Sequence, residues 1–280
     1  MSLKLVVGLV SMNISLEFLK DAALKTAEKI RFLSASEEAF KVVGFGAGGD
    51  ESRYVDVAAE ETIIKLLKDY GVPCIFIGEE KGVVKIFDEK PRAYVLVDSL
   101  DGTNNFLRGI PFYAVSLAVA EKPILSSVYA AVVLEISSGK LFYAEKGKGS
   151  WLNGKRIKPS NIEDFKDAVV SIDIPPHGEA LEKSLKIAKN STHLRRLGAV
   201  SLEVCYVAAG MIDVHVDLKG KIRVVDLAAA YLIIKEAGGL IVDGDGRELD
   251  MPADLPTRRT TIISAANLNL LKKVFMLLES

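Results

Sequence analysis

The apolar run Val95–Val97 ends in an acid, and no other segment constrains the fold and chemistry of the chain as much. Asp98 closes the run, Asp101 follows three residues later, and Gly102 and Thr103 come next. Such a run is typical of a buried strand, and ligands of open α/β sheets bind at strand ends. Two carboxylates held together there either shift their pKa values or hold a cation. Oxygen ligands favour Mg²⁺, Ca²⁺ or Mn²⁺ over Zn²⁺.

The composition is that of a soluble globular protein. The 280 residues are 49% hydrophobic and 26% charged, which suits one large domain or two smaller ones. The net charge of −1 gives no sign of a nucleic-acid footprint or of affinity for anionic membranes, so we expect neither partner. The chain has no glutamine and many Lys, Glu, Ile and Val residues, and this composition favours a thermophilic source.

The cysteines and the first residues fit a cytoplasmic protein. Cys74 and Cys205 lie in apolar runs, so we expect buried free thiols rather than a disulfide, as in a reducing compartment. The apolar segment Leu3–Val10 is too short to span a bilayer, and no small-residue cleavage site follows it. We expect this segment to form a helix packed on the domain.

The first half of the chain is expected to combine two helices with a largely antiparallel sheet. Apolar spacing predicts helices over 15–40 and 57–70, separated by the glycine-rich loop Gly44–Gly49. Apolar or alternating runs predict strands at 74–77, 94–97, 113–120, 127–136 and 140–144. With turns at Ser138-Gly139 and Asn153-Gly154, the last three strands are typical of an antiparallel meander.

From about residue 165 strands and helices alternate. We expect strands at 168–172, 212–218 and 261–265, and helices at 178–190, 199–209, 227–237 and 268–278. The chain is thus predicted to be an α/β (α+β) protein of two closely packed subdomains. Residues 1–160 would carry metal-binding loops, and residues 161–280 would supply Asp226 and substrate contacts.

Two further acids follow apolar runs. Glu79 comes after the expected strand 74–77, and Asp226 comes after Val224-Val225, directly before an expected helix. Taken alone, Glu79 would be a surface turn acid and Asp226 a helix N-cap. The pair Asp98 and Asp101 has a structural alternative as well, an Asx-turn at a strand end.

The residues after Asp101 favour binding of an anion. Gly102, Thr103 and Asn104 are expected to open a short helix, whose free N–H groups would face an anion, and glycine allows close approach to the backbone. Carboxylate-held divalent ions beside such a helix start suit phosphate chemistry. The Thr103 hydroxyl could orient an attacking water or merely satisfy a backbone group.

The motifs of the chain resemble those of the inositol monophosphatase family, within the lithium-sensitive, magnesium-dependent phosphatase superfamily. The family's Asp-Pro-Ile/Leu-Asp-Gly-Thr/Ser stands here as 98–103 (Asp-Ser-Leu-Asp-Gly-Thr), and its Gly-Glu-Glu stands as 78–80. Its Trp-Asp-x-Ala-(Ala/Gly) is similar to 225–229, with the expected Glu-Ala-Gly-Gly at 236–239. The Arg-x-x-Gly-x-Ala block is similar to 195–200.

The resemblance implies roles for particular residues. Two or three Mg²⁺ ions would be held by Glu79, Asp98, the Leu100 carbonyl, Asp101 and Asp226. Thr103, with Asp56 and Glu79 behind it, would activate the water. Asp101, Gly102 and Thr103 would contact the substrate and its phosphate. The family also implies a layered αβαβα fold and a homodimer.

The sequence departs from the family pattern in two places. Ser99 replaces the usual proline, which would loosen the turn but leave the Leu100 carbonyl available. Gly48 stands where the archaeal branch has an acid for a third, weaker metal, with Asp50 as a substitute. Gly44-x-Gly46-x-x-Gly49 formally matches a dinucleotide fingerprint, but a mobile loop over the metal site fits its surroundings better.

The hypothesis from the sequence is a magnesium-dependent phosphomonoesterase that hydrolyses inositol 1-phosphate and/or fructose 1,6-bisphosphate by in-line attack of a metal-activated water. A bisphosphate needs a cationic group at its far end, and Arg195, Arg196 and Lys219 are candidates, with solvated surface charge as the alternative. A 3′-phosphatase acting on 3′-phosphoadenosine 5′-phosphate is the rival within the family. A non-catalytic RNA- or transcription-associated member is the rival from another class.

Overall fold

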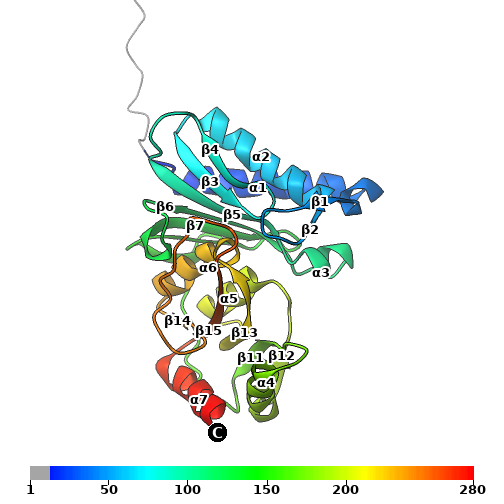
Figure 1. Cartoon of the computed structure of the whole chain (residues 1–280). Helices are drawn as coiled ribbons and strands as arrows, with labels where there is room; N and C mark the ends of the chain where they lie inside the picture. The colour runs from blue at the N-terminus through cyan, green and yellow to red at the C-terminus, as the bar shows by residue number, and fades with distance from the viewer. Residues whose placement is uncertain (1–12) are drawn as a thin grey trace, which may run out of the picture.

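The computed structural model describes residues 13–280. The expected N-terminal helix at Leu3–Val10 lies outside the described residues. Five layers follow one another in the order helix, sheet, helix, sheet, helix (Figure 1). The predicted αβαβα arrangement is therefore confirmed. Among the described residues, no helix is both long and apolar enough to cross a membrane.

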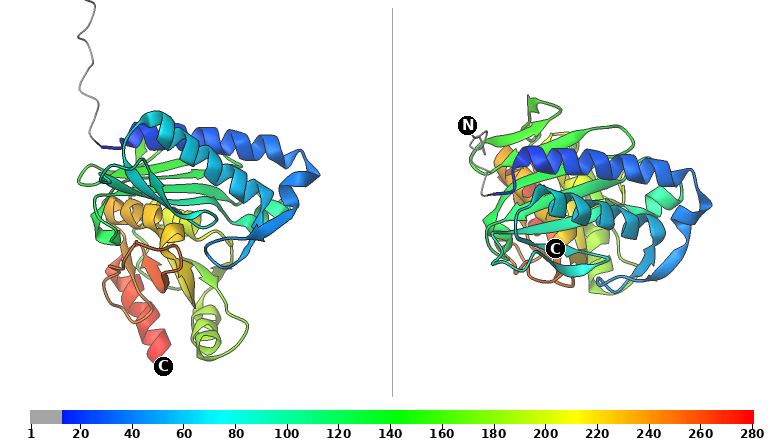
Figure 2. Two further views of the ribbon diagram at one scale, coloured as in Figure 1. Left: turned by 45° about the horizontal axis from the view of Figure 1, so that its top comes forward. Right: turned by 90° about the horizontal axis from the view of Figure 1, so that it is seen from above.

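The helices form three of the layers. One pair lies side by side over the outer face of the large sheet, a second pair fills the space between the two sheets, and a third pair covers the far face of the small sheet (Figures 1 and 2). In that order the pairs are α1 (Leu16–Ser34) with α2 (Tyr54–Tyr70), α5 (Val200–Ala208) with α6 (Val224–Ala237), and α4 (Glu179–Asn190) with α7 (Leu268–Glu279).

The large sheet has eight strands in the order β10-β9-β8-β7-β6-β5-β3-β4. All neighbours pair antiparallel except β3 and β5, so the predicted meander is confirmed. The sequence analysis missed β4, β9 and β10, which are short. The strands are β3 (Cys74–Gly78), β4 (Gly82–Ile86), β5 (Ala93–Asp101), β6 (Ala114–Ala120), β7 (Val128–Glu135), β8 (Leu141–Glu145), β9 (Gly149–Leu152) and β10 (Lys155–Arg156).

The small sheet has five strands in the order β12-β11-β13-β15-β14. Three of them match expected strands, and the two edge strands of three residues each were not predicted. They are β11 (Val169–Asp173), β12 (His193–Arg195), β13 (Val214–Arg223), β14 (Leu240–Val242) and β15 (Arg259–Ala265). A separate two-stranded hairpin, β1 (Val42–Phe45) with β2 (Glu51–Arg53), holds the glycine-rich loop at its turn.

Helix α6 lies in the middle layer and explains why the two halves pack so closely. Every residue from Val224 to Ile234 is buried, because both sheets cover the helix. The same hydrophobic cluster contains Leu96 from the large sheet and Ile262 from the small sheet. A division of the chain at residue 160 stays a prediction.

Several predicted boundaries differ from the observed ones. The helix expected over 15–40 ends at Ser34, and a separate 3-10 turn follows at Glu37–Phe40, capped by the Ser36 hydroxyl. A second 3-10 turn lies at Leu125–Ser127. Helices α2 and α6 begin three residues earlier than expected. Both cysteines, Cys74 and Cys205, are buried free thiols, as predicted.

Candidate active site

Strand β5 continues through both aspartates, whereas the sequence predicted an end at Val97. Asp98 pairs with Ser116 of β6 and Asp101 with Ala114, and the register shifts between them. An irregularity of this kind re-aims side chains next to active sites. It lets both carboxylates of one strand reach the same cavity.

Glu79 comes from the neighbouring parallel strand. Gly78, the last residue of β3, pairs with Val97 of β5, so Glu79 leaves its strand beside Asp98. The carboxylate of Glu60 in α2 accepts hydrogen bonds from the N–H groups of Glu80 (2.9 Å) and Lys81 (2.7 Å), which fixes the chain after the strand.

Asp226 reaches the same place from the middle layer. The expectation that Asp226 is a helix N-cap is wrong, because α6 already begins at Val224 and the capping residue is Arg223. The Asp226 carboxylate instead accepts a hydrogen bond from the Arg223 N–H at 2.9 Å. The second carboxylate oxygen accepts a hydrogen bond from the Arg223 side chain, Nε to Oδ1, at 3.1 Å.

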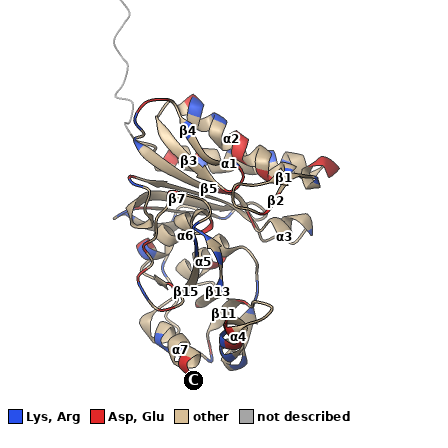
Figure 3. Ribbon diagram, in the orientation of Figure 1, with Lys and Arg blue, Asp and Glu red and all other residues tan. Residues whose placement is uncertain are grey.

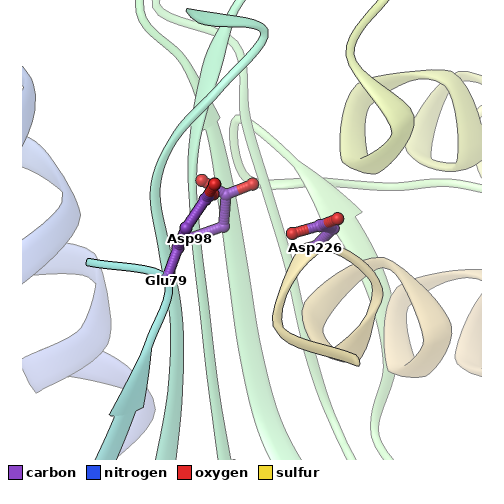
Figure 4. A group of neighbouring side chains, drawn as sticks. All are labelled: Glu79, Asp98 and Asp226. Carbon is purple, nitrogen blue, oxygen red and sulfur yellow. The ribbon is translucent and has the colours of Figure 1, made fainter. Parts of the chain in front are cut away.

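Glu79, Asp98 and Asp226 form a group of three converging acids. Each offers a carboxylate oxygen within 4.8 Å of those of the other two, and Asp226 faces the other two from across the gap (Figure 4). Burial raises the pKa of Glu79 to about 8, and burial followed by the charge of Asp101 raises the pKa of Asp98 well above its ordinary value. Three carboxylates with raised pKa values, those of Asp98 and Asp226 buried and that of Glu79 partly buried, suit a divalent cation, because a cation offsets their repulsion.

Asp101 lies beside this group and is held by α5. Its Oδ2 atom accepts hydrogen bonds from the Ser201 N–H at 2.8 Å and from the Ser201 hydroxyl at 2.5 Å. Burial raises the pKa of Asp101 to about 7. The sequence analysis did not foresee Ser201.

Thr103 lies at the start of α3 (Thr103–Leu107), as predicted. Its hydroxyl lies 2.9 Å from the Leu100 carbonyl oxygen and 3.4 Å from the Asp56 carboxylate, and it can donate to either. Burial, followed by the charge of Glu80, raises the pKa of Asp56 to about 7. The Ser99 hydroxyl donates to the Asp56 carbonyl oxygen at 3.2 Å, so the serine that replaces the family proline ties β5 to α2.

Gly102 precedes α3 and cannot be replaced without strain. Its φ of 88° is in the left-handed region, and an added Cβ would lie 2.9 Å from the Phe112 carbonyl oxygen and 3.1 Å from the Ala199 Cβ. Gly102 and the first residues of α3, Thr103 and Asn104, line the same cavity as the acids.

Arg223 is the main residue that the sequence analysis missed. Its guanidinium forms ion pairs with Glu79, Asp226 and Asp50 of the β1–β2 turn. A signal was present, because Arg-Val-Val-Asp at 223–226 has the same form as Arg-Tyr-Val-Asp at 53–56, which also leads into a helix.

None of the three cationic candidates lines the cavity that holds the acids. Lys219 bonds to Asp173 and lies 3.3 Å from the Asp217 carboxylate, and Arg196 donates to Asp173 at 2.8 Å. Lys219 lines a small pocket of about 160 Å³ that also touches Asp101, Gly198 and Asp226. Arg195 is exposed in β12 and donates to the Leu194 carbonyl oxygen.

The main cavity has a volume of about 370 Å³ and is strongly acidic. Its lining has two arginines, Arg53 and Arg223, and eight acids: Asp50, Glu51, Asp56, Glu79, Glu80, Asp98, Asp101 and Asp226. Elsewhere in the described chain, acidic and basic residues are spread over all layers (Figure 3). Acids gathered in one hollow of a nearly neutral protein indicate a cation site.

The comparisons with known proteins agree with this geometry. The model of the inositol monophosphatase family matches residues 15–275. The chain belongs to the inositol monophosphatase family. It is 35% identical to a fructose-1,6-bisphosphatase/inositol-1-monophosphatase of Methanothermobacter thermautotrophicus over 272 residues, 93% of this chain and 96% of that protein. The chain is thus a phosphatase, a hydrolase of phosphate monoesters.

A solved structure and a bifunctional relative extend the comparison. A crystal structure described as an inositol monophosphatase-fructose 1,6-bisphosphatase matches with a TM-score of 0.83 and 33% identity, over 93% of this chain and 98% of that one. A bifunctional NADP phosphatase/NAD kinase of Methanococcus maripaludis is 32% identical over 89% of this chain but only 47% of its own length. The family to which the motifs pointed is confirmed.

Proposed function

We propose that the chain is a magnesium-dependent phosphomonoesterase of small polyol and sugar phosphates. The observation that carries this proposal is the convergence of Glu79, Asp98 and Asp226 beside the start of α3. Their oxygen donors suit Mg²⁺, and the neighbouring N–H groups of α3 suit a phosphate. The fructose-bisphosphatase and inositol-monophosphatase activities named for the relatives support the choice of substrates.

The residues of the chain divide into a cation-binding and a phosphate-binding set. Glu79, Asp98, Asp226, Asp101 and the Leu100 carbonyl would hold Mg²⁺. When bound, Mg²⁺ would neutralise phosphate charge and make a water more acidic. The N–H groups of Thr103 and Asn104 precede the first hydrogen bond of α3, from Phe106 N–H to the Gly102 carbonyl oxygen, and would bind the phosphate.

Thr103 would orient the attacking water. Its hydroxyl has acceptors in the Leu100 carbonyl and the Asp56 carboxylate, so its own oxygen can accept a hydrogen bond from the water. A carboxyl group with a pKa near 7, as Asp56 has, can take up a proton at neutral pH. Glu79 lines the same cavity, and its carboxylate would accept a second hydrogen bond from that water.

The part of the substrate beyond the phosphate would enter the pocket beside Lys219. Lys219 is already paired with Asp173 and Asp217, and Arg196 shares Asp173. The carboxylates of these pairs can accept hydrogen bonds from the hydroxyl groups of a polyol. The cations of the same pairs can bind a second phosphate. We therefore propose polyol monophosphates as the first substrates to test and the bisphosphate as the second.

Phosphate release tests the proposal directly. The substrates are inositol 1-phosphate, fructose 1,6-bisphosphate, 3′-phosphoadenosine 5′-phosphate and NADP, each with Mg²⁺ and with EDTA. Magnesium-dependent turnover of the first two would support the sugar-phosphatase function. Turnover of the nucleotides alone would move the chain to the nucleotide phosphatases, for which the NADP phosphatase relative provides the reason. A folded chain that releases no phosphate but binds RNA would support the alternative of a non-catalytic, RNA- or transcription-associated family member.

The homodimer and the cytoplasmic location are further parts of the proposal. The resemblance to the family suggests the dimer, and the buried free thiols fit a reducing compartment. The mass measured by light scattering at several protein concentrations would distinguish a dimer from a monomer.

A further inference from the structure

Arg223 is a cation built into the acidic cavity. Its guanidinium bonds to Glu79 at the end of β3, to Asp226 in α6 (Nε–Oδ1, 3.1 Å) and to Asp50 in the β1–β2 turn (Nη1–Oδ2, 3.1 Å). The side chain is only 14% exposed. The other arginine of the described cavity lining, Arg53, bonds elsewhere, to the Phe40 carbonyl and Glu51. Arg223 thus supplies the fixed positive charge in contact with the three-acid group.

Gly48 makes room for this guanidinium. A Cβ at residue 48 would lie 2.8 Å from Arg223 Nη1 and 3.2 Å from Glu79 Cγ. The Gly48 N–H donates to the Glu79 carbonyl oxygen at 2.8 Å, and Arg259 donates to the Gly48 carbonyl oxygen at 3.0 Å. The turn, Glu79 and Arg223 are therefore packed as one unit, and a side chain at residue 48 would push the guanidinium off Glu79.

We propose that the Arg223 guanidinium competes with the divalent cation for the Glu79 carboxylate. Once it is displaced from Glu79, the guanidinium still holds the β1–β2 turn through Asp50. Without metal, Arg223 forms ion pairs with two of the three acids, Glu79 and Asp226. A divalent cation needs the same carboxylates, so its binding weakens the Arg223–Glu79 pair. The guanidinium keeps Asp50 as a partner, so the β1–β2 turn stays held after the cation has bound. This inference rests on the proposed function only in taking the acids as a cation site.

Calorimetric titration with Mg²⁺ tests the competition. Arg223→Gln should bind Mg²⁺ about ten-fold more tightly or better, because a positive charge within a few ångströms of the ion is removed. Its melting temperature without metal should fall. Arg258→Gln removes the same charge from an exposed arginine paired with Asp254 and should leave the affinity unchanged. Arg223→Lys keeps the positive charge, so its affinity for Mg²⁺ should stay near that of the wild type. Unchanged or weaker binding by a folded Arg223→Gln would overturn the competition.

Amide hydrogen exchange of residues 46–50 tests the fastening of the turn. With saturating Mg²⁺, these amides should exchange several-fold faster in Arg223→Gln and in Asp50→Asn than in the wild type. Only Arg223→Gln should also bind Mg²⁺ more tightly, because Asp50→Asn keeps the guanidinium beside the acids. Amide exchange at the wild-type rate in both variants would refute the proposal that Arg223 holds the turn through Asp50. Both measurements are made without substrate, so they are independent of whether the chain is a phosphatase.

Discussion

At the scale of single residues, the site depends on how each acid is held. Asp98 is buried and forms no ion pair with any residue of 13–280, and a cation would offset the charge repulsion that adds to burial in raising its pKa. Asp101 is held by two hydrogen bonds from Ser201, and Asp226 by the Arg223 N–H. The motifs of the sequence located all of these acids. They did not point to the contacts of Arg223, because these depend on where a long side chain ends in space, and only the likeness of 223–226 to 53–56 could have drawn attention to it.

Replacing Asp98 should separate catalysis from folding. Asp98→Asn should lower phosphate release at least about a hundred-fold, because the loss of a cation ligand removes several kcal/mol of transition-state stabilisation. The fold should survive, since the asparagine carries no charge into a buried position. Circular dichroism and phosphate release with Mg²⁺ measure the two effects. Asp69→Asn, at an exposed position of α2, is the control. A near-normal rate and metal affinity in Asp98→Asn would contradict the assignment.

Gly102 allows a second test at this scale. Gly102→Ala should destabilise the protein by about 1–3 kcal/mol and lower phosphate release, because the residue needs both a positive φ and an empty Cβ position. Gly109→Ala is a matched control, since Gly109 has a φ of 70° and open space around its Cβ position. Urea unfolding should show a clearly larger loss for Gly102→Ala. Equal losses would mean that crowding against Phe112 and Ala199 has no effect.

At the scale of elements, two helices enter the site in the same way. Arg53 precedes α2 and Arg223 precedes α6, and in each helix the third residue, Asp56 or Asp226, accepts a hydrogen bond from that arginine's N–H. The side chain of a capping arginine offers no acceptor, which is why pattern analysis placed both helix starts three residues late. The edge strands β12 and β14 were missed because each is only three residues long.

Ser201 connects α5 to β5 and gives the element-scale prediction. Ser201→Ala removes the hydroxyl donor to Asp101 but keeps the backbone N–H donor, so stability should fall by about 1–3 kcal/mol. The affinity for Mg²⁺ should fall as well, because Asp101 loses part of its orientation. Urea unfolding and titration with Mg²⁺ measure the two effects. Ser126→Ala is a surface control. Wild-type stability in Ser201→Ala would show that the N–H group suffices.

At the scale of the whole molecule, buried acids make stability depend on pH. Burial raises the pKa of Asp56, Glu60 and Asp101 to about 7 and that of Glu79 to about 8. Between about pH 4 and these values the folded chain binds more protons than the unfolded chain, so stability falls as the pH rises. In EDTA, the free energy of unfolding should be higher at pH 5.5 than at pH 8.5, and Mg²⁺ should restore it at the higher pH. Urea unfolding at both pH values measures this, and greater stability at pH 8.5 in EDTA would contradict it.

The thiols report on the integrity of the layers. Cys74 and Cys205 are buried, and burial raises the pKa of Cys74 to about 12. A thiol reagent at pH 8 should label neither residue in the native protein and both in urea. Rapid labelling without denaturant would show that the layers open readily.

The central helix has a consequence for how the protein matures. Glu79 and Asp98 come from the large sheet, whereas Asp226 follows β13 of the small sheet and lies in the first turn of the helix that both sheets enclose. A nascent chain that has made only the first sheet has two of the three acids and no partner for them. Tight cation binding would therefore report that the large sheet and helix α6 have come together, and purified samples could be compared by that property before any substrate is chosen.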